Sequence, residues 1–163
     1  MRLLIFSSEF PPGPGGIGTH AMKSLGSFRN RTGMFPLFAA GLRLKEEVVA
    51  FNRSQPFPIV QLNSPAIAPL KAAQRWLVKK RWIKEWQPDV ILASGQRAVW
   101  LAASLSHRLP WVAVGHGTEF GSSIGWAKKI ARWSFQQATS VVCVSQYTRQ
   151  QMFAVGIRQR SSA

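Results

Sequence analysis

The chain has 163 residues, 46% of them hydrophobic, which is enough for one domain with a packed core and argues against disorder. Lysine and arginine number 21 against 6 acidic residues, a formal net charge of +15, so the surface should attract phosphates of nucleic acid, anionic lipid or nucleotide sugar alike. No apolar run approaches the roughly 18 residues of a membrane span, and the stretch after Met1 is too short for a secretory signal, so we expect a cytoplasmic protein. The single cysteine, Cys143, excludes an internal disulfide or a cysteine zinc site.

Apolar runs alternate with longer amphipathic stretches along the chain, which is typical of an α/β fold with a doubly wound, mainly parallel, Rossmann-like sheet. Strands are predicted over residues 2–7, 34–39, 59–62, 90–93, 111–115 and 140–144. Helices are predicted over residues 18–28, 69–86, 96–107, 124–138 and 146–155. The second strand is the poorest, because Pro36 would interrupt the hydrogen bonding of a central strand.

The first predicted strand leads into a glycine-rich loop. Gly15, Gly16 and Gly18 lack the Cβ atoms that would hold a ligand away, and a helix that begins near Gly18 points its free N–H groups back at the loop. This pattern predicts an anion site built from the N–H groups of Gly15, Gly16 and Ile17. His20 would either reach the ligand or cap local backbone.

Two other interpretations of this loop stay open. The spacing of Gly13, Gly15 and Gly18 also satisfies the pattern of a nicotinamide or flavin dinucleotide site. That pattern needs an acidic residue about 20 positions on to hold the ribose, and none lies between Glu9 and Glu46. The third interpretation is a structural turn without a ligand.

Further polar loops follow the later predicted strands. His116 and Glu119 stand after the fifth strand, and Ser145 and Arg149 stand after the sixth. The carboxyl ends of parallel strands meet at one edge of a sheet. We therefore expect residues 15–20, 94–96, 116–119 and 145–149 to line one cleft.

Three segments occur together in one order: Phe10-Pro11-Pro12 with GGIGTH at residues 15–20, VGHGTE at 114–119 and VCVSQYTR at 142–149. They resemble the opening loop, the His-Gly-Thr-Glu loop and the Val-Ser-x-x-Thr-Arg segment of the family-4 (group 1) glycosyltransferases, which have the GT-B fold. The resemblance covers most of the chain and corresponds to the N-terminal, acceptor-side half of such an enzyme. It implies retaining transfer from a nucleotide-diphosphate sugar to a glycan or lipid acceptor, with no cofactor and no metal.

The resemblance also implies roles for individual residues. His116 matches the active-site histidine of the family and would hydrogen-bond the donor sugar or orient the acceptor, with a satisfied loop histidine as the alternative. Glu119 would position that loop rather than act as a base. The donor-binding groups, in the loops after the first and last predicted strands, would be Gly15, Gly16, Ile17, His20, Ser145 and Arg149.

Two segments, residues 22–37 and 158–163, depart from the family pattern. The first loses its helical stripe within two turns and the pattern recovers from Phe38 onward, as a pair of compensating frame changes would produce. We expect residues 1–163 to form the N-terminal domain alone, with the C-terminal, donor-binding half absent or supplied by a separate chain. This chain by itself would then be inactive in sugar transfer, and a noncatalytic remnant of such an enzyme is an alternative.

Basic and aromatic residues interleave in two predicted helices. Such helices suit contact with an anionic membrane surface, or they pack on the sheet while their lysine stems reach water. A basic nucleic-acid-binding domain is the alternative function, weakened because the basic residues are spread over several helices rather than gathered in one recognition motif. The residues concerned are Lys71, Arg75, Trp76, Lys79, Lys80, Arg81, Trp82, Lys84 and Trp86 in helix 69–86, and Trp126, Lys128, Lys129, Ile130, Arg132 and Trp133 in helix 124–138.

Overall fold

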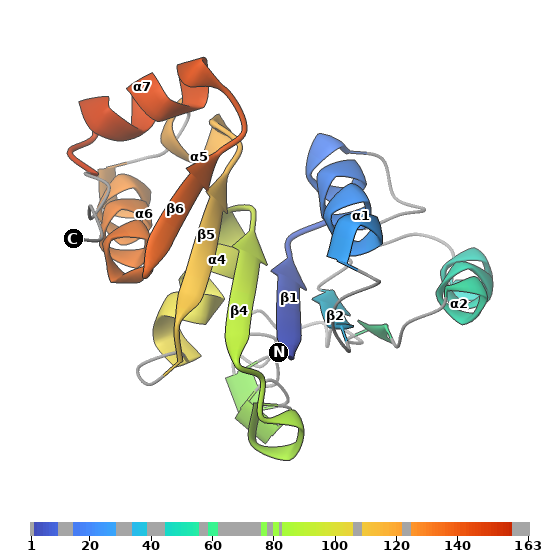
Figure 1. The fold of residues 1–163 in the computed structure, drawn as a ribbon. Helices are drawn as coiled ribbons and strands as arrows, with labels where there is room; N and C mark the ends of the chain where they lie inside the picture. The colour runs from blue at the N-terminus through green and yellow to red at the C-terminus, as the bar shows by residue number, and fades with distance from the viewer. Residues whose placement is uncertain are drawn as a thin grey trace.

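The computed structural model describes residues 2–9, 15–28, 34–38, 45–55, 59–61, 76–77, 80–81, 83–105, 109–121 and 125–157. Within these residues six strands form one sheet in the order β3-β2-β1-β4-β5-β6, and every neighbouring pair is parallel (Figure 1). The strands are β1 (Leu3–Ser7), β2 (Met34–Phe38), β3 (Val60–Gln61), β4 (Val90–Ser94), β5 (Trp111–Gly115) and β6 (Ser140–Cys143). The doubly wound, parallel α/β sheet predicted from the sequence is confirmed, and each predicted strand has its counterpart.

The described helices are α1 (Gly16–Phe28), α2 (Lys45–Ser54), α4 (Gln96–Leu105), α5 (Thr118–Gly121), α6 (Gly125–Gln137) and α7 (Gln146–Ala154). Four of these were predicted, whereas α2 and α5 were not. Of the predicted helix 69–86, residues 76–77, 80–81 and 83–86 are helical and the others lie outside the described residues. No helix in the described part of the chain is long and apolar enough to cross a membrane.

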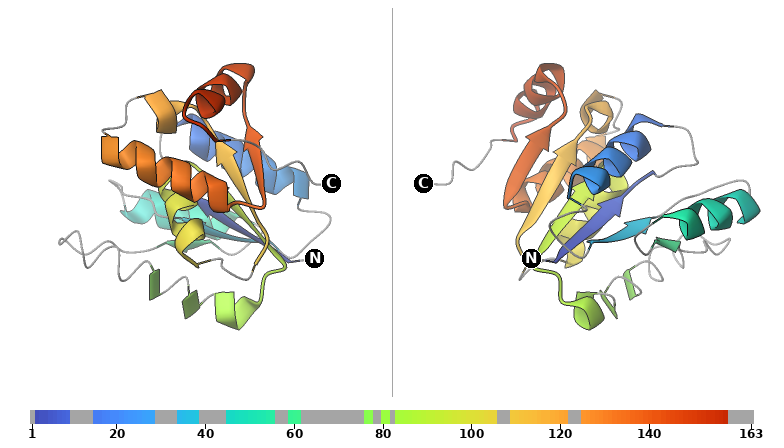
Figure 2. Two further views of the ribbon diagram at one scale, coloured as in Figure 1. Left: turned by 90° about the vertical axis from the view of Figure 1, so that its left-hand side faces the viewer. Right: turned by 45° about the vertical axis from the view of Figure 1, so that its right-hand side comes forward.

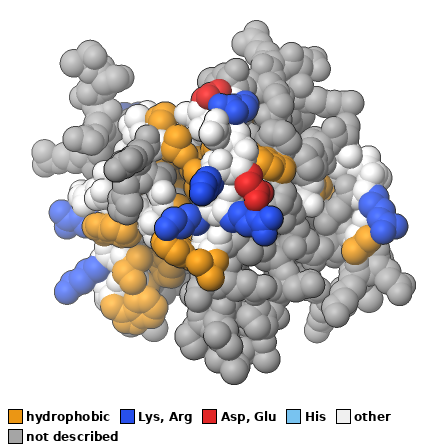
Figure 3. All heavy atoms as spheres, turned by 90° about the horizontal axis from the view of Figure 1, so that it is seen from below, with side chains coloured by type: hydrophobic (Ala, Val, Ile, Leu, Met, Phe, Trp, Pro, Cys, Tyr) orange, Lys and Arg blue, Asp and Glu red, His pale blue; other side chains and the backbone are white. Residues whose placement is uncertain are grey.

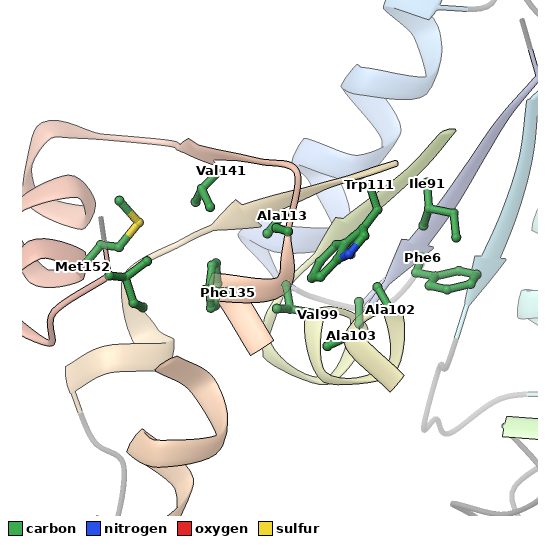
Figure 4. Packing of buried hydrophobic residues seen from close by; sticks show 14 of the residues in the cluster. Phe6, Ile91, Val99, Ala102, Ala103, Trp111, Ala113, Phe135, Val141 and Met152 are labelled. Atoms are coloured by element: carbon green, nitrogen blue, oxygen red, sulfur yellow. The ribbon is translucent and has the colours of Figure 1, made fainter. Parts of the chain in front are cut away.

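The first strand shows why a short run of apolar residues forms the centre of this fold. Leu4 and Phe6 enter a large core together with buried residues of α4 and α6, while Leu3 and Ile5 enter a second core with Ala21 of α1 (Figure 4 shows the larger core). Helices α4 and α6 lie on one face of the sheet and α1 on the other (Figure 2). A strand covered on both faces favours a continuous run of apolar side chains, and β1 has one from Leu3 to Phe6.

Strand β2 forms despite Pro36. It lies between β1 and β3, and Pro36 stands opposite Ile5 in the parallel register. From the sequence we expected Pro36 to interrupt the hydrogen bonding of this strand, but β2 pairs with both β1 and β3. A proline removes a single N–H, so the strand loses at most one bond of its ladder at that position. Helix α1 likewise continues to Phe28, beyond the two turns over which its apolar stripe is visible.

Candidate functional site

The strand order reverses between β1 and β4, with β2 and β3 on one side and β5 and β6 on the other. In open α/β sheets a ligand crevice forms outside the carboxyl ends of the strands at such a point. Backbone and side-chain bonds join the loops there: the Ser8 N–H donates to the Ser94 carbonyl at 2.9 Å, and the Ser8 hydroxyl accepts from the Ala98 N–H at 3.2 Å. The loops after β1 and β4 therefore lie together, as predicted.

Two glycines near the candidate site, one before α1 and one after β4, have backbone conformations that favour glycine. Gly15 has φ +144°, and a Cβ there would overlap the carboxylate of Glu9. Gly95, with φ +86°, follows β4, and a Cβ there would stand only 3.2 Å from Ile17 Cγ2. Both backbone positions favour glycine, because other residues rarely adopt these φ values. At Gly16, where α1 begins, an added Cβ would meet none of the described residues within 4 Å, so these residues leave the space beside the first turn open.

Two histidines meet at the same edge of the sheet. His20 belongs to α1 and His116 to the loop after β5, and their rings lie edge to face with centroids 5.3 Å apart and an interplanar angle of 85°. His20 Nδ1 is buried and has no hydrogen-bond partner among the described residues. His116 Nε2 is hydrogen-bonded to Ser94 Oγ at 2.9 Å. The structure thus brings the two predicted histidines together and adds Ser94 to them.

The environment of His116 keeps its imidazole neutral. Burial, and to a lesser extent the neighbouring His20, lower the pKa of His116 from 6.5 to about 4. Both effects act against the charged ring, since burial removes its hydration and a second histidine repels it. At pH 7 His116 can donate or accept a hydrogen bond, but it has no proton to give as an imidazolium acid.

Glu119 lies behind His116 and supports its loop. The side chain is only 1% exposed, and both carboxylate oxygens accept the His116 N–H at 3.1 Å. Burial raises the pKa of Glu119, while hydrogen bonds from the backbone of Glu119, His116 and Gly117 oppose that rise. These contacts tie the Glu119 side chain to the backbone of the loop.

Ser145 and Arg149, the other predicted donor-binding residues, lie at α7 (Figure 1, upper left). The Ser145 hydroxyl caps this helix: it accepts the Thr148 N–H at 3.1 Å and lies 3.0 Å from Thr148 Oγ1. The Arg149 guanidinium lies over the Phe153 ring, 5.5 Å from its centroid. Both residues line an open hollow of about 560 Å³ along β6, next to Cys143.

Two residues near the site were not assigned a role from the sequence. Ser94 ends β4. The one feature of the sequence that could have pointed to it is its place in the segment 94–96, which was expected at the edge of the sheet. Glu9 lies against Gly15, a contact that depends on how the loop folds back and has no sequence signal. In the part of the chain that the structure describes, no group of three or more His, Cys, Asp or Glu side chains is placed to hold a metal ion.

The sheet order, the glycine loop and the paired histidines define a Rossmann-like domain whose candidate site lies at its switch point. The sequence profile of Glycosyltransferase Family 4 matches residues 14–162, and the chain belongs to this family. No curated protein matches it.

Solved structures share the fold at low sequence identity. Anabaena HepE in complex with UDP superposes with a TM-score of 0.70 at 19% identity, covering 97% of this chain and 42% of that one. The lipopolysaccharide outer core galactosyltransferase WaaB superposes with a TM-score of 0.68 at 18% identity, and the match covers 97% of this chain and 43% of WaaB. The UDP-GlcNAc 2-epimerase of Methanocaldococcus jannaschii superposes with a TM-score of 0.63 at 11% identity, and the match covers 97% of this chain and 43% of the epimerase. The chain therefore spans less than half the length of these proteins.

Proposed function

We propose that this domain contributes to the transfer of a sugar from a nucleotide-diphosphate sugar to a glycan or lipid acceptor, with retention of anomeric configuration. The observation that carries the proposal is the convergence of the open first turn of α1 with His20 and His116 at the switch point of the sheet. Family membership supports it, and so do the HepE structures, which hold UDP or UDP-glucose.

In this proposal the diphosphate lies at the first turn of α1. The N–H groups at the start of a helix have no partners within the helix, and its dipole favours an anion there. Gly15 has no side chain to cap this helix, and α1 has no acidic residue in its first turn. The N–H groups of Gly16 and Ile17 can therefore meet the negative charge that develops on the leaving diphosphate. The Glu9 carboxylate lies close by and has to turn away from the incoming phosphates.

His116 acts in this proposal as a neutral hydrogen-bonding group. With a pKa of about 4 it carries no charge at pH 7, so it is suited to a sugar or acceptor hydroxyl rather than to a phosphate. His20 Nδ1, buried and without a partner among the described residues, is available to the same ligand. Glu119 keeps the His116 backbone in place for this contact.

Turnover needs further groups on the other side of the donor. The chain covers 42% of HepE, and we propose that a second domain, on this or a separate chain, holds the base and neutralises the diphosphate. An open half-site leaves the leaving group in water, where each N–H contact contributes little to the transition state. Residues 1–163 alone should bind the diphosphate weakly and show no sugar transfer.

A matched pair of glycine variants tests the binding site. Gly16 and Gly125 each begin a helix, and at each an added Cβ would meet no atom of the described part of the chain within 4 Å. Gly16→Ala should reduce UDP affinity at least about tenfold in calorimetry, because a methyl group beside the first N–H keeps phosphate from close approach. Gly125→Ala should leave the affinity unchanged. Equal affinity for all three proteins, or binding of a DNA duplex in preference to UDP, would contradict the proposed site.

Helix α6 supports the proposal that the acceptor side faces an anionic membrane surface. Ala131, Ser134 and Phe135 of α6 are buried, whereas Trp126, Ile130 and Trp133 form an exposed stripe, with Trp126 60% exposed. Seen from below, exposed hydrophobic side chains on the molecule lie next to lysine and arginine (Figure 3). Tryptophan at headgroup depth beside cations is the arrangement that anionic lipid favours. The cations of α6, all exposed, are Lys128, Lys129 and Arg132.

Vesicle sedimentation tests this part of the proposal. At low salt the chain should sediment with vesicles containing phosphatidylglycerol and not with phosphatidylcholine alone. A Trp126→Ser and Trp133→Ser double variant should stay in the supernatant. Tyr147→Ser, which removes a 63% exposed aromatic residue of α7, should sediment like the unaltered chain. Equal recovery in the supernatant with and without the acidic lipid would contradict membrane contact.

A further inference from the structure

A side-chain hydrogen bond joins the ends of two neighbouring strands at the site. Ser94 is the last residue of β4, and His116 follows the last residue of β5, which pairs with β4. The register sets Ser94 opposite Val114, two residues before His116, and this brings Ser94 Oγ to 2.9 Å from His116 Nε2. Both strands are fixed in the middle of the sheet, so the position of this contact is set by the fold rather than by a mobile loop.

Either the Ser94 hydroxyl or His116 Nε2 can be the donor of this hydrogen bond, and the burial of the serine proton decides between the two. Ser94 is 1% exposed, and its hydroxyl has no other hydrogen bond among the described residues. If His116 Nε2 carried the proton, the serine proton would be buried without an acceptor, and an unsatisfied buried donor is costly. If the serine donates to Nε2, its proton is satisfied, and the imidazole proton sits on Nδ1.

We propose that Ser94 is a positioning residue that donates its hydroxyl proton to His116 Nε2, holds the neutral ring in the Nδ1–H tautomer, and so presents an N–H donor to the ligand. The ligand atom that His116 recognises is then a hydrogen-bond acceptor, such as the oxygen of a sugar hydroxyl. The identity of this ligand rests on the proposed function, whereas the tautomer itself does not.

His20 supports the same assignment by restricting the ring. Its imidazole stands at 85° to that of His116 with centroids 5.3 Å apart, so His116 is held between Ser94 at one ring nitrogen and the edge-to-face contact of His20. The Glu119 carboxylate fixes the backbone of His116 at the same time. The ring and the backbone of His116 are therefore both held in place. The tautomer of the ring then depends on whether Ser94 donates its hydroxyl proton to Nε2.

Nitrogen-15 NMR of the histidine side chains measures the tautomer without ligand or activity. At pH 7 the unaltered chain should show a protonated, pyrrole-like Nδ1 and an unprotonated, pyridine-like Nε2 for His116, assigned by the loss of these signals in His116→Gln. Ser94→Ala should move the tautomer ratio at least about fivefold toward Nε2–H, the change that loss of one hydrogen bond produces. Ser94→Thr retains the hydroxyl and should restore the original ratio.

Ser134→Ala is the control. Ser134 is a fully buried serine of α6, and its substitution should leave the His116 signals unchanged. A protonated Nε2 in the unaltered chain would overturn the proposal, and this spectrum decides the matter even where Ser94→Ala fails to fold. An unchanged ratio in folded Ser94→Ala would also overturn it. If the tautomer is as expected but UDP does not bind, the proposed function fails while the role of Ser94 stands.

Discussion

Helices α1 and α7 both follow a strand at the same edge of the sheet, yet their first turns differ. Ser145 caps α7 with its own hydroxyl, which already accepts the Thr148 N–H. Helix α1 follows Gly15, which has no side chain, and among the described residues no side-chain cap is seen at its start. A helix start that satisfies itself is a structural device, whereas one that does not is an anion site. This difference is the reason for proposing that the diphosphate lies at α1 rather than at α7.

The largest effect in this comparison is expected at Gly15. Gly15→Ala forces a side chain onto φ +144° and into the Glu9 carboxylate, which should destabilise the fold by about 1–3 kcal/mol. The first turn of α1 should shift with it, and UDP affinity should fall. Urea denaturation and calorimetry measure the two effects, with Gly125→Ala as the control. Unchanged stability would show that the loop before α1 is not constrained as described.

Removing the cap of α7 should have a smaller effect on stability and none on binding. Ser145→Ala leaves the Thr148 N–H without its partner and should cost about 1 kcal/mol of unfolding free energy. UDP affinity should stay within a factor of about two. A clear loss of affinity in a variant that remains folded would reverse the comparison, because it would place the ligand at α7.

Glu9 offers a gain of affinity at α1. The carboxylate lies against Gly15, where it would repel an incoming diphosphate, so Glu9→Gln should raise UDP affinity by roughly three- to tenfold at low salt. The gain should shrink as salt is added. A drop in affinity would indicate that Glu9 contacts the ligand through a group that prefers the carboxylate, for example a sugar hydroxyl.

The last prediction concerns pH. The pKa of His116 falls from 6.5 in the unfolded chain to about 4 in the fold, so the unfolded chain binds more protons between these values. The free energy of unfolding should therefore be unaffected by this histidine above pH 6.5 and should fall progressively as the pH is lowered from 6.5 toward 4, because the unfolded chain gains a proton that the folded chain does not. The raised pKa of Glu119 acts with the opposite slope, because its stabilising contribution is lost as pH rises above its ordinary value. His116→Gln should therefore lose less stability on acidification than the unaltered chain, and equal losses would contradict the assignment.

The sheet was predictable from the sequence because its strands are short apolar runs separated by turn residues. Strand β1 is apolar from Leu3 to Phe6, and this continuous pattern indicated burial on both faces. Helix α2 was missed because it begins with the charged residues Lys45, Glu46 and Glu47, and α5 was missed because it has only four residues.

The site was predictable in part. His20 and His116 were placed at one edge because both follow strands that a parallel sheet aligns. The hydrogen bond of His116 to Ser94 was not predictable, because it joins residues 22 apart in sequence and depends on the register of β4 with β5. The cap at Ser145 was open to prediction, since serine before a helix commonly caps it, but the resemblance had assigned it to the ligand.

The most direct test of the account is a UDP titration of the unaltered chain followed by backbone amide NMR. The account predicts that the amides of Gly16 and Ile17 shift most, because their N–H groups meet the diphosphate, and that His116 shifts with them when UDP-glucose replaces UDP. The amides of Gln146 and Tyr147 at the start of α7 should remain in place. Shifts confined to α7, or none at the start of α1 at millimolar UDP, would contradict the assignment of the donor diphosphate to α1.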